Sequence, residues 1–89
     1  MQKQHEPESP ASLTLRVWGR NISHARNEAG LTQEELGAMF VPVLVHQSTV
    51  ARWEKGRIEP SLDHKLALAG HLNRPAALLF PLPNVLGAA

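Results

Sequence analysis

Apolar residues recur at intervals of three and four along several short segments of the chain, and no segment alternates as a strand would. This spacing predicts amphipathic helices that each direct one face toward a shared core. The longest helix is expected over residues 13–29, because Gly30 supplies a common helix ending. Its predicted apolar face comprises Leu15, Trp18, Ile22, Ala25 and Ala29.

A capping signal marks the start of a second helix. The Thr32 side chain can accept a backbone N–H bond and Glu35 can return one, so this capping box predicts that the helix begins at Gln33. The helix should end near Phe40, because Pro42 disfavours helical geometry in the residue before it. Its buried side is expected to hold Leu36, Met39 and Phe40.

A third helix is expected over residues 47–55, closed by Gly56. Val50 and Trp53 lie three positions apart and are predicted to point inward. A helix this short is poorly stable alone, so its neighbours must hold it in place. The residues that share its opposite face are Gln47, Ser48, Ala51, Arg52 and Lys55.

Two more helices are predicted toward the C-terminus. Ser61 is the expected cap of a fourth helix, and Pro75 suits the first turn of a short fifth helix that ends at Pro81. The core stripe of the fourth helix is predicted to be Leu62, Leu66, Ala69 and Leu72. The predicted fold class is therefore all-α, a compact bundle of five short helices.

The two ends of the chain lack this periodicity. Residues 1–12 are polar and contain two prolines, which predicts a flexible N-terminal arm. Residues 81–89 are apolar without a repeat and are interpreted as a C-terminal tail. The helical domain is expected over residues 13–80.

Composition narrows the class of protein. The chain of 89 residues allows one domain, and zero cysteines exclude a disulfide framework or a thiolate zinc site. A small domain without these staples indicates a reducing compartment, so the expected location is the cytoplasm. No apolar run approaches the length of a membrane span.

Charge becomes informative only through its position. The formal net charge of +1 is too small to indicate a nucleic-acid binder by itself. Within residues 47–57, however, Arg52, Lys55 and Arg57 stand against a single acid, Glu54. Two consecutive helices, the second with an exposed polar face, form the geometry that enters a DNA major groove. Gln, Ser and Arg side chains can read the base edges there.

Three stretches resemble the helix-turn-helix proteins of the phage repressor, Cro and xenobiotic-response-element type. They are GLTQEEL at residues 30–36, STVARWEKG at 48–56 and EPS at 59–61, and the resemblance covers roughly residues 18–80. It implies a lambda-repressor-like fold and a sequence-specific regulator that binds double-stranded DNA. No enzymatic step, cofactor, metal or small-molecule substrate is expected.

The resemblance also implies roles for individual residues. Base contacts are expected from Gln47, Ser48 and Arg52, and an ion pair is expected between Arg26 and Glu54. Gln33 matches a residue that bonds a phosphate and braces the third helix, while His46 is expected either to touch a phosphate or to cap that helix. The expected contacts to the DNA backbone are Thr32, Gln33, His46, Thr49, Lys55 and Arg57.

The turn between the second and third helices departs from the family pattern. Residues 41–46 make it about three residues longer than usual, and apolar rather than glycine-rich. Two conformations stay open: a stiff, longer elbow, or an extension of the third helix with Pro42 in its first turn.

Two readings of function follow. The first is a transcriptional regulator, a phage or prophage Cro-like protein or minimal repressor, that occupies an operator, with a homodimer as one expected form. The alternative is an antitoxin or protein-interaction component, suggested by the apolar residues Phe80, Leu82, Val85 and Leu86.

Trp18 and Trp53 are expected in the core, and His64 and His71 on the surface without a metal.

Overall fold

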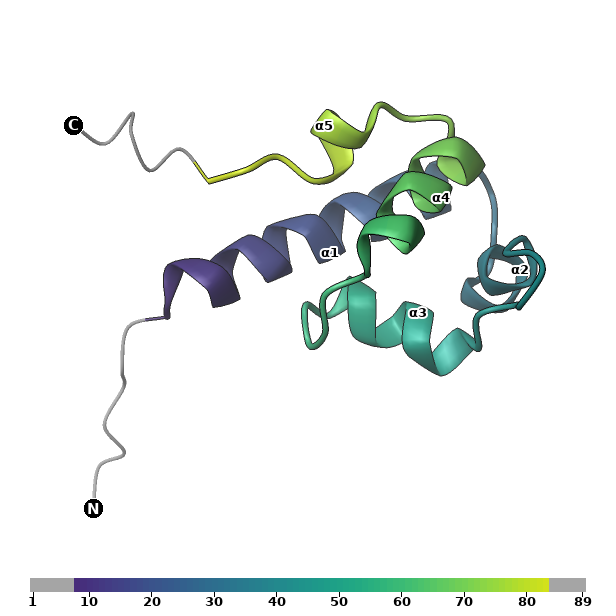
Figure 1. The fold of residues 1–89 in the computed structure, drawn as a ribbon, viewed down its shortest axis with the longest axis horizontal. Coiled ribbons are helices and arrows are strands. Elements are labelled where there is room, and N and C mark those ends of the chain that lie inside the picture. Colours follow the sequence, from purple (N-terminus) through teal and green to yellow (C-terminus); the bar gives the residue numbers. More distant parts are fainter. Residues whose placement is uncertain (1–7, 84–89) are drawn as a thin grey trace, which may run out of the picture.

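The computed structural model describes residues 8–83, and this part of the chain forms five helices and no strand. Figure 1 shows α1 running through the middle of the fold, with α3 on one side and α5 on the other. The predicted all-α bundle of five short helices is confirmed. The helices are α1 (Pro10–Glu28), α2 (Gln33–Ala38), α3 (Gln47–Glu54), α4 (Leu62–Leu72) and α5 (Ala76–Leu79).

Helix α1 begins three residues earlier than predicted. Ser9 caps it by accepting the N–H of Ser12 at 3.1 Å, and Pro10 occupies the first helical position, where its missing N–H is not needed. Residues 10–12 therefore belong to the helix and not to the arm. Of the rest of the predicted arm, Glu8 and the cap Ser9 are described, and residues 1–7 lie outside the described residues. At the other end, Ala29 lies beyond the helix and is exposed, contrary to its predicted place on the buried face.

The capping box at α2 is confirmed. Thr32 Oγ1 accepts the N–H of Glu35 at 3.0 Å, and Glu35 Oε1 accepts the N–H of Thr32 at 2.8 Å. Leu36 and Phe40 are buried as expected. The prediction for Met39 is wrong, because the helix ends at Ala38 and the Met39 side chain lies in solvent.

The long turn takes the elbow conformation, since α3 starts only at Gln47. Val45 anchors the turn: its side chain is buried, and its N–H donates to the carbonyl of Gly37 in α2 at 2.9 Å. This contact requires glycine at position 37, because an added Cβ would overlap the Val45 carbonyl oxygen. The elbow is thus fixed to α2 at its C-terminal end.

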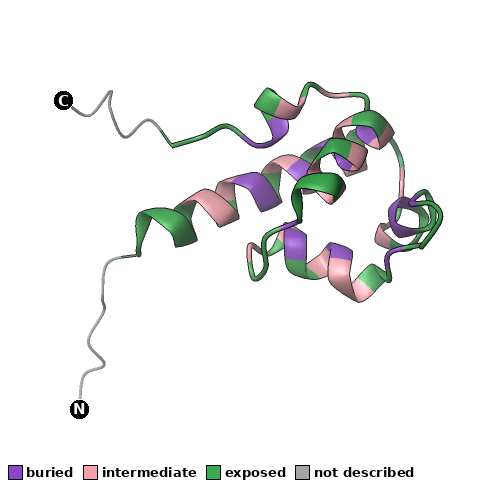
Figure 2. Cartoon of the chain, viewed as in Figure 1, coloured by how far each residue is buried: buried purple, intermediate pink, exposed green. Residues whose placement is uncertain are grey.

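The core draws on all five helices (Figure 2). Trp18 and Trp53 are buried in it, as predicted. Phe40 is surrounded by the other aromatic rings, with His71 at 4.9 Å, His64 at 5.5 Å and Trp53 at 5.8 Å between ring centroids. The predicted surface role of His64 and His71 is therefore wrong: both rings are half-buried and pack edge-on against Phe40.

The predicted core stripe of α4 is half right. Leu72 is buried and Ala69 packs against the core as expected, but Leu62 and Leu66 are 70% and 57% exposed. Lys65 takes an inward position in this helix, with its ammonium 4.3 Å from the Trp18 ring centroid. A lysine can be held there by the aromatic ring and by its apolar stem, which a hydrophobic pattern does not register.

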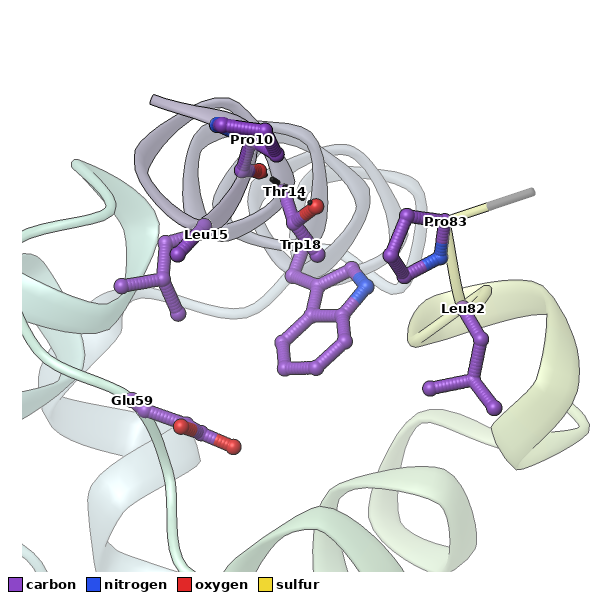
Figure 3. Close-up of a pocket in the computed structure, with 8 residues that line it drawn as sticks. Pro10, Thr14, Leu15, Trp18, Glu59, Leu82 and Pro83 are labelled. Carbon is purple, nitrogen blue, oxygen red and sulfur yellow. Dashed lines mark hydrogen bonds between the residues drawn. The ribbon is translucent and has the colours of Figure 1, made fainter. Parts of the chain in front are cut away.

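The segment after α5 folds back on α1. Phe80 is buried edge-on against Trp18, and Trp18 Nε1 donates to the carbonyl of Pro81 at 2.8 Å. Figure 3 shows Leu82 and Pro83 across from Trp18, with a hollow of about 320 Å³ between this segment and the start of α1. Leu82 itself is exposed, and Val85 and Leu86 lie outside the described residues. No helix within residues 8–83 combines the length and the apolar character needed to cross a membrane.

Candidate nucleic-acid interface

Helix α3 is clamped between α1 and α2. Its inward-facing residues Val50 and Trp53 are buried, as their spacing predicted. At its C-terminal end, Gly19 of α1 lies so close that an added Cβ would overlap the carbonyl oxygens of Trp53 and Glu54. These contacts hold a short helix that would be unstable alone.

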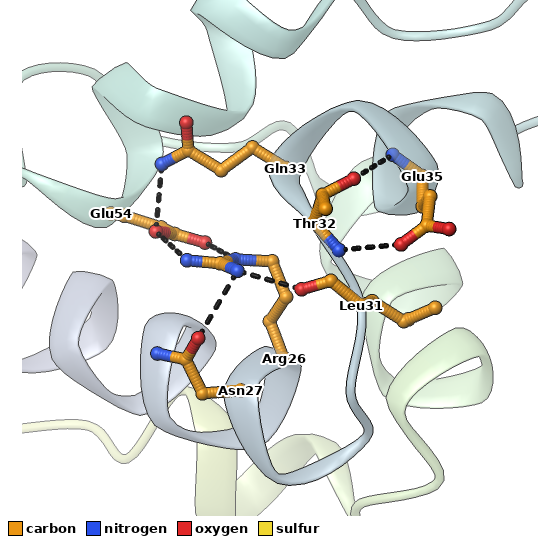
Figure 4. Close-up of polar contacts among 7 residues, drawn as sticks. All are labelled: Arg26, Asn27, Leu31, Thr32, Gln33, Glu35 and Glu54. Atoms are coloured by element: carbon orange, nitrogen blue, oxygen red, sulfur yellow. Dashed lines mark hydrogen bonds and ion pairs between the residues drawn. The ribbon is translucent and has the colours of Figure 1, made fainter.

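A buried ion pair braces the C-terminal end of α3 (Figure 4). Arg26 Nε donates to Glu54 Oε2 at 2.6 Å and Nη2 donates to Oε1 at 3.0 Å, the two-pronged geometry of a strong Arg–carboxylate contact. The two side chains are only 12% and 7% exposed. The hydrogen bond to Glu54 raises the pKa of Arg26 above its ordinary value.

The same cluster ties α2 to α3. Gln33 Nε2 donates to Glu54 Oε1 at 3.0 Å, and Arg26 Nη1 donates to the Leu31 carbonyl at 2.7 Å (Figure 4). The carboxylate of Glu54 therefore has partners from both α1 and α2. The acid in α3 is neutralised inside the protein, so it does not oppose a polyanion at the surface.

The outer face of α3 carries the residues that the sequence singled out. Gln47 and Arg52 are exposed, and Ser48, Thr49 and Ala51 are half-exposed between them. His46 caps the helix: its Nδ1 accepts the N–H of Ser48 at 3.0 Å and lies 2.8 Å from Ser48 Oγ. Of the two roles weighed for His46, capping is therefore the one seen here.

The cations near α3 differ from those elsewhere. Within residues 8–83, the side chains of Arg52, Lys55 and Arg57 form no ion pair or hydrogen bond. In the same range, Arg16, Arg26, Lys65 and Arg74 are each paired with a glutamate. Arg20, on α1, is the other cation without a partner among these residues. Free positive charge thus gathers at the end of α3.

Two shallow hollows flank Gln47. One, of about 380 Å³, is lined by polar residues from the start of α2, among them Thr32 and Gln33. The other, of about 310 Å³, lies toward the elbow and is lined by Leu44 and Ala38 together with Glu34 and His46. Gln47, an expected base contact, therefore shares a surface with the expected backbone contacts Thr32, Gln33 and His46. The hollow beside Leu44 was not predicted, because it depends on how the elbow folds against α2.

The part of the chain that the structure describes contains no candidate metal-binding cluster. No group of three His, Asp or Glu side chains lies close enough there to hold a metal ion.

The braced pair of helices with an exposed polar second helix defines the helix-turn-helix class of DNA-binding proteins. Residues 22–79 match the family model described as Helix-turn-helix, and the chain belongs to this family. The chain is therefore a DNA-binding transcription regulator of a non-enzymatic family whose members bind double-stranded DNA.

Among solved structures, the chain is similar to the restriction-modification controller protein C.AhdI from Aeromonas hydrophila. The sequences are 28% identical, the TM-score is 0.71, and the match covers 81% of this chain and 100% of that chain. A comparison with curated proteins finds no match.

Proposed function

We propose that this regulator recognises a specific operator by placing α3 in the major groove, where Gln47, Ser48 and Arg52 contact base edges. The observation that carries the proposal is the exposed polar face of α3 on a helix braced from behind by Arg26 and Glu54. A rigid recognition helix loses little freedom on binding, so its polar groups contribute to affinity and specificity.

The contacts to the DNA backbone follow from the same orientation. Lys55 and Arg57 extend the free positive charge beyond the end of α3. In the proposed orientation they reach the phosphates of a flanking DNA strand. Thr32, Gln33, Thr49 and His46 complete the set around the starts of α2 and α3. The Gln33 Nε2 donates one of its two hydrogens to Glu54, so its second N–H is the group that can donate to a phosphate (Figure 4).

The simplest mode of action is occupancy. Bound at its operator, the protein excludes polymerase or a competing regulator, as a minimal repressor or Cro-like protein of a phage or prophage does. The motifs at residues 30–36 and 48–56 support this reading. It places the protein in the cytoplasm, on the nucleoid.

A second candidate is control of restriction-modification genes. The observation that favours it is the similarity to C.AhdI, which extends over that protein's whole chain. The two candidates predict different operator locations. An operator upstream of restriction and methylation genes favours the controller, and one between phage genes favours the repressor.

The test is selection of bound duplexes from random DNA, followed by fluorescence anisotropy titrations of the winner at several salt concentrations. We expect one preferred sequence, with an affinity that falls steeply as salt rises because counterions are released from the phosphates. Equal affinity for the selected and a scrambled duplex would contradict the proposal.

We further propose that two copies bind together through the apolar surface of α4 and α5, with both α3 helices facing the same side of the duplex. Leu62, Leu66 and Leu82 are exposed on this surface and line a hollow of about 590 Å³ that reaches Trp18 and Phe80, and Leu78 of α5 is also exposed. The three free cations near α3 neutralise few phosphates per chain, so a second copy would double both the charge and the base contacts. Two-fold symmetric half-sites match such a dimer.

Sedimentation equilibrium tests the dimer. The full chain should show a dimer mass, and Leu66→Ser should shift it toward the monomer, whereas Val43→Ser, an equally apolar and exposed site in the elbow, should not. A wild-type monomer both free and on DNA would contradict the dimer. Association with a different protein instead of a second copy would favour the antitoxin alternative. Of the apolar residues that suggested this alternative, Leu82 is exposed and Phe80 is buried.

A further inference from the structure

The elbow between α2 and α3 exposes three aliphatic side chains. Val41, Val43 and Leu44 are 84%, 77% and 64% exposed, although the elbow lies directly before the recognition helix. Single exposed aliphatic residues are ordinary, but a contiguous group commonly marks a binding surface. The proposed base contacts at α3 do not use this group.

Leu44 is the member of this group that borders the proposed interface. It lines the hollow of about 310 Å³ together with Ala38 of α2 and with His46 and Gln47 at the start of α3. On its other side, Gln47 borders the polar hollow that contains Thr32 and Gln33. Glu34 of α2 lines both hollows, and Leu44 supplies an apolar wall on one side of Gln47.

The two residues that follow Leu44 in the chain are both held in place. Val45 is buried and donates its N–H to the Gly37 carbonyl at 2.9 Å, and His46 caps α3. Leu44 thus directly precedes two consecutive anchored residues, so the position of its backbone relative to Gln47 is set before any partner arrives. Val41 and Val43 lie farther from these anchors along the elbow.

The chemistry of the major groove offers one apolar group on a base edge, the C5-methyl of thymine. A protein partner seated in this hollow would cover His46 and Gln47 and so compete with the operator. An apolar side chain fixed beside a glutamine that can read a base instead suits a second base contact.

We propose that Leu44 packs against the C5-methyl of a thymine beside the base pair contacted by Gln47. The elbow then adds a position of sequence preference that the three polar residues of α3 do not supply. This inference rests on the proposed function, since it requires α3 to lie in the major groove.

The test replaces thymine by deoxyuridine, which removes the methyl group and keeps the pairing edge. Each thymine of the selected operator is changed singly, and the affinity of the full chain is measured by anisotropy. We expect one position in each half-site at which the methyl group is worth about fourfold in affinity, the value for burying one such group. Because this scan uses the wild-type protein, it does not depend on how a variant folds.

The variants Leu44→Ala and Val43→Ala then assign the contact. Leu44→Ala should bind the thymine and deoxyuridine duplexes equally, and Val43→Ala should keep the wild-type difference. Retention of the full difference in Leu44→Ala, or the absence of any sensitive thymine in the selected operator, would overturn the inference alone. Equal affinity of the wild-type protein for the selected operator and for a scrambled duplex would overturn the proposed function as well.

Discussion

The half of the molecule built from α2 and α3 and the half built from α4 and α5 are both held against α1, but by different contacts. At α3 the contacts are a close backbone approach at Gly19 and a largely buried charge cluster around Glu54. At α4 and α5 they are aromatic and aliphatic, as in the edge-on pair of Trp18 and Phe80.

The two halves also present opposite surfaces. On the α2 and α3 side, Glu54 is paired internally, Glu34 is exposed, and Arg52, Lys55 and Arg57 are free. The α4 and α5 side pairs its cations with glutamates and leaves four leucines exposed. The small net charge is therefore an average over two different faces, one suited to a polyanion and the other to an apolar partner.

The largest expected effect concerns the buried brace. Arg26→Met leaves the Glu54 carboxylate buried without its main partner, so the free energy of unfolding should fall by about 3–5 kcal/mol. Urea unfolding followed by fluorescence of the buried Trp18 and Trp53 measures this loss.

A matched control uses an ion pair on the other half of the molecule. Arg74 pairs with Glu28 at the surface, so Arg74→Met should lower the free energy of unfolding by no more than about 1 kcal/mol. Equal losses in the two variants would contradict the contrast between a buried and a solvated pair. Adding Glu54→Leu to Arg26→Met should recover part of the loss, because no buried charge is then left unpaired.

Two glycines should respond in opposite directions. Gly37→Ala forces a Cβ against the Val45 carbonyl, so we expect a loss of about 1–3 kcal/mol in the free energy of unfolding. Gly70 lies within α4 with open space around it, so Gly70→Ala should stabilise the protein by about 0.5–1 kcal/mol. Thermal and urea unfolding of both variants check the prediction. The same sign for both would contradict the close approach at α2.

The smallest expected effect is electrostatic. Lys55→Ala should reduce the slope of log affinity against log salt by about 1, because one phosphate contact is lost. Lys65→Ala should leave the slope unchanged, since Lys65 is paired with Glu59 and lies over Trp18. Anisotropy titrations of the selected operator between low and moderate salt measure both slopes. A reduction with Lys65→Ala instead would place the DNA on the other half of the molecule.

The sequence was most informative where a signal is local. The capping box at Thr32 and Glu35 and the inward pair of Val50 and Trp53 involve residues a few positions apart, so their pattern predicts their contacts. The expected partnership of Arg26 and Glu54 came instead from family resemblance, because residues 28 positions apart show no local pattern.

The failures arose where tertiary contacts decide the outcome. The stripe predicted for α4 ignored Lys65, whose inward position depends on the Trp18 ring in another helix. The conformation of the elbow depends on the backbone contact between Val45 and Gly37, which no periodicity reveals. Leu44 could be identified as apolar from the sequence, but its place beside Gln47 could not.

The most direct measurement compares Arg52→Ala with Arg20→Ala on the selected operator and on a scrambled duplex. Both substitutions remove one exposed cation that has no partner within residues 8–83, and only Arg52 lies on the outer face of α3. If α3 reads the bases, Arg52→Ala should weaken operator binding by about ten- to a hundredfold and reduce the preference over the scrambled duplex. Arg20→Ala should preserve that preference. Equal losses for the two variants, or an unchanged preference in Arg52→Ala, would contradict the assignment of α3 as the recognition helix.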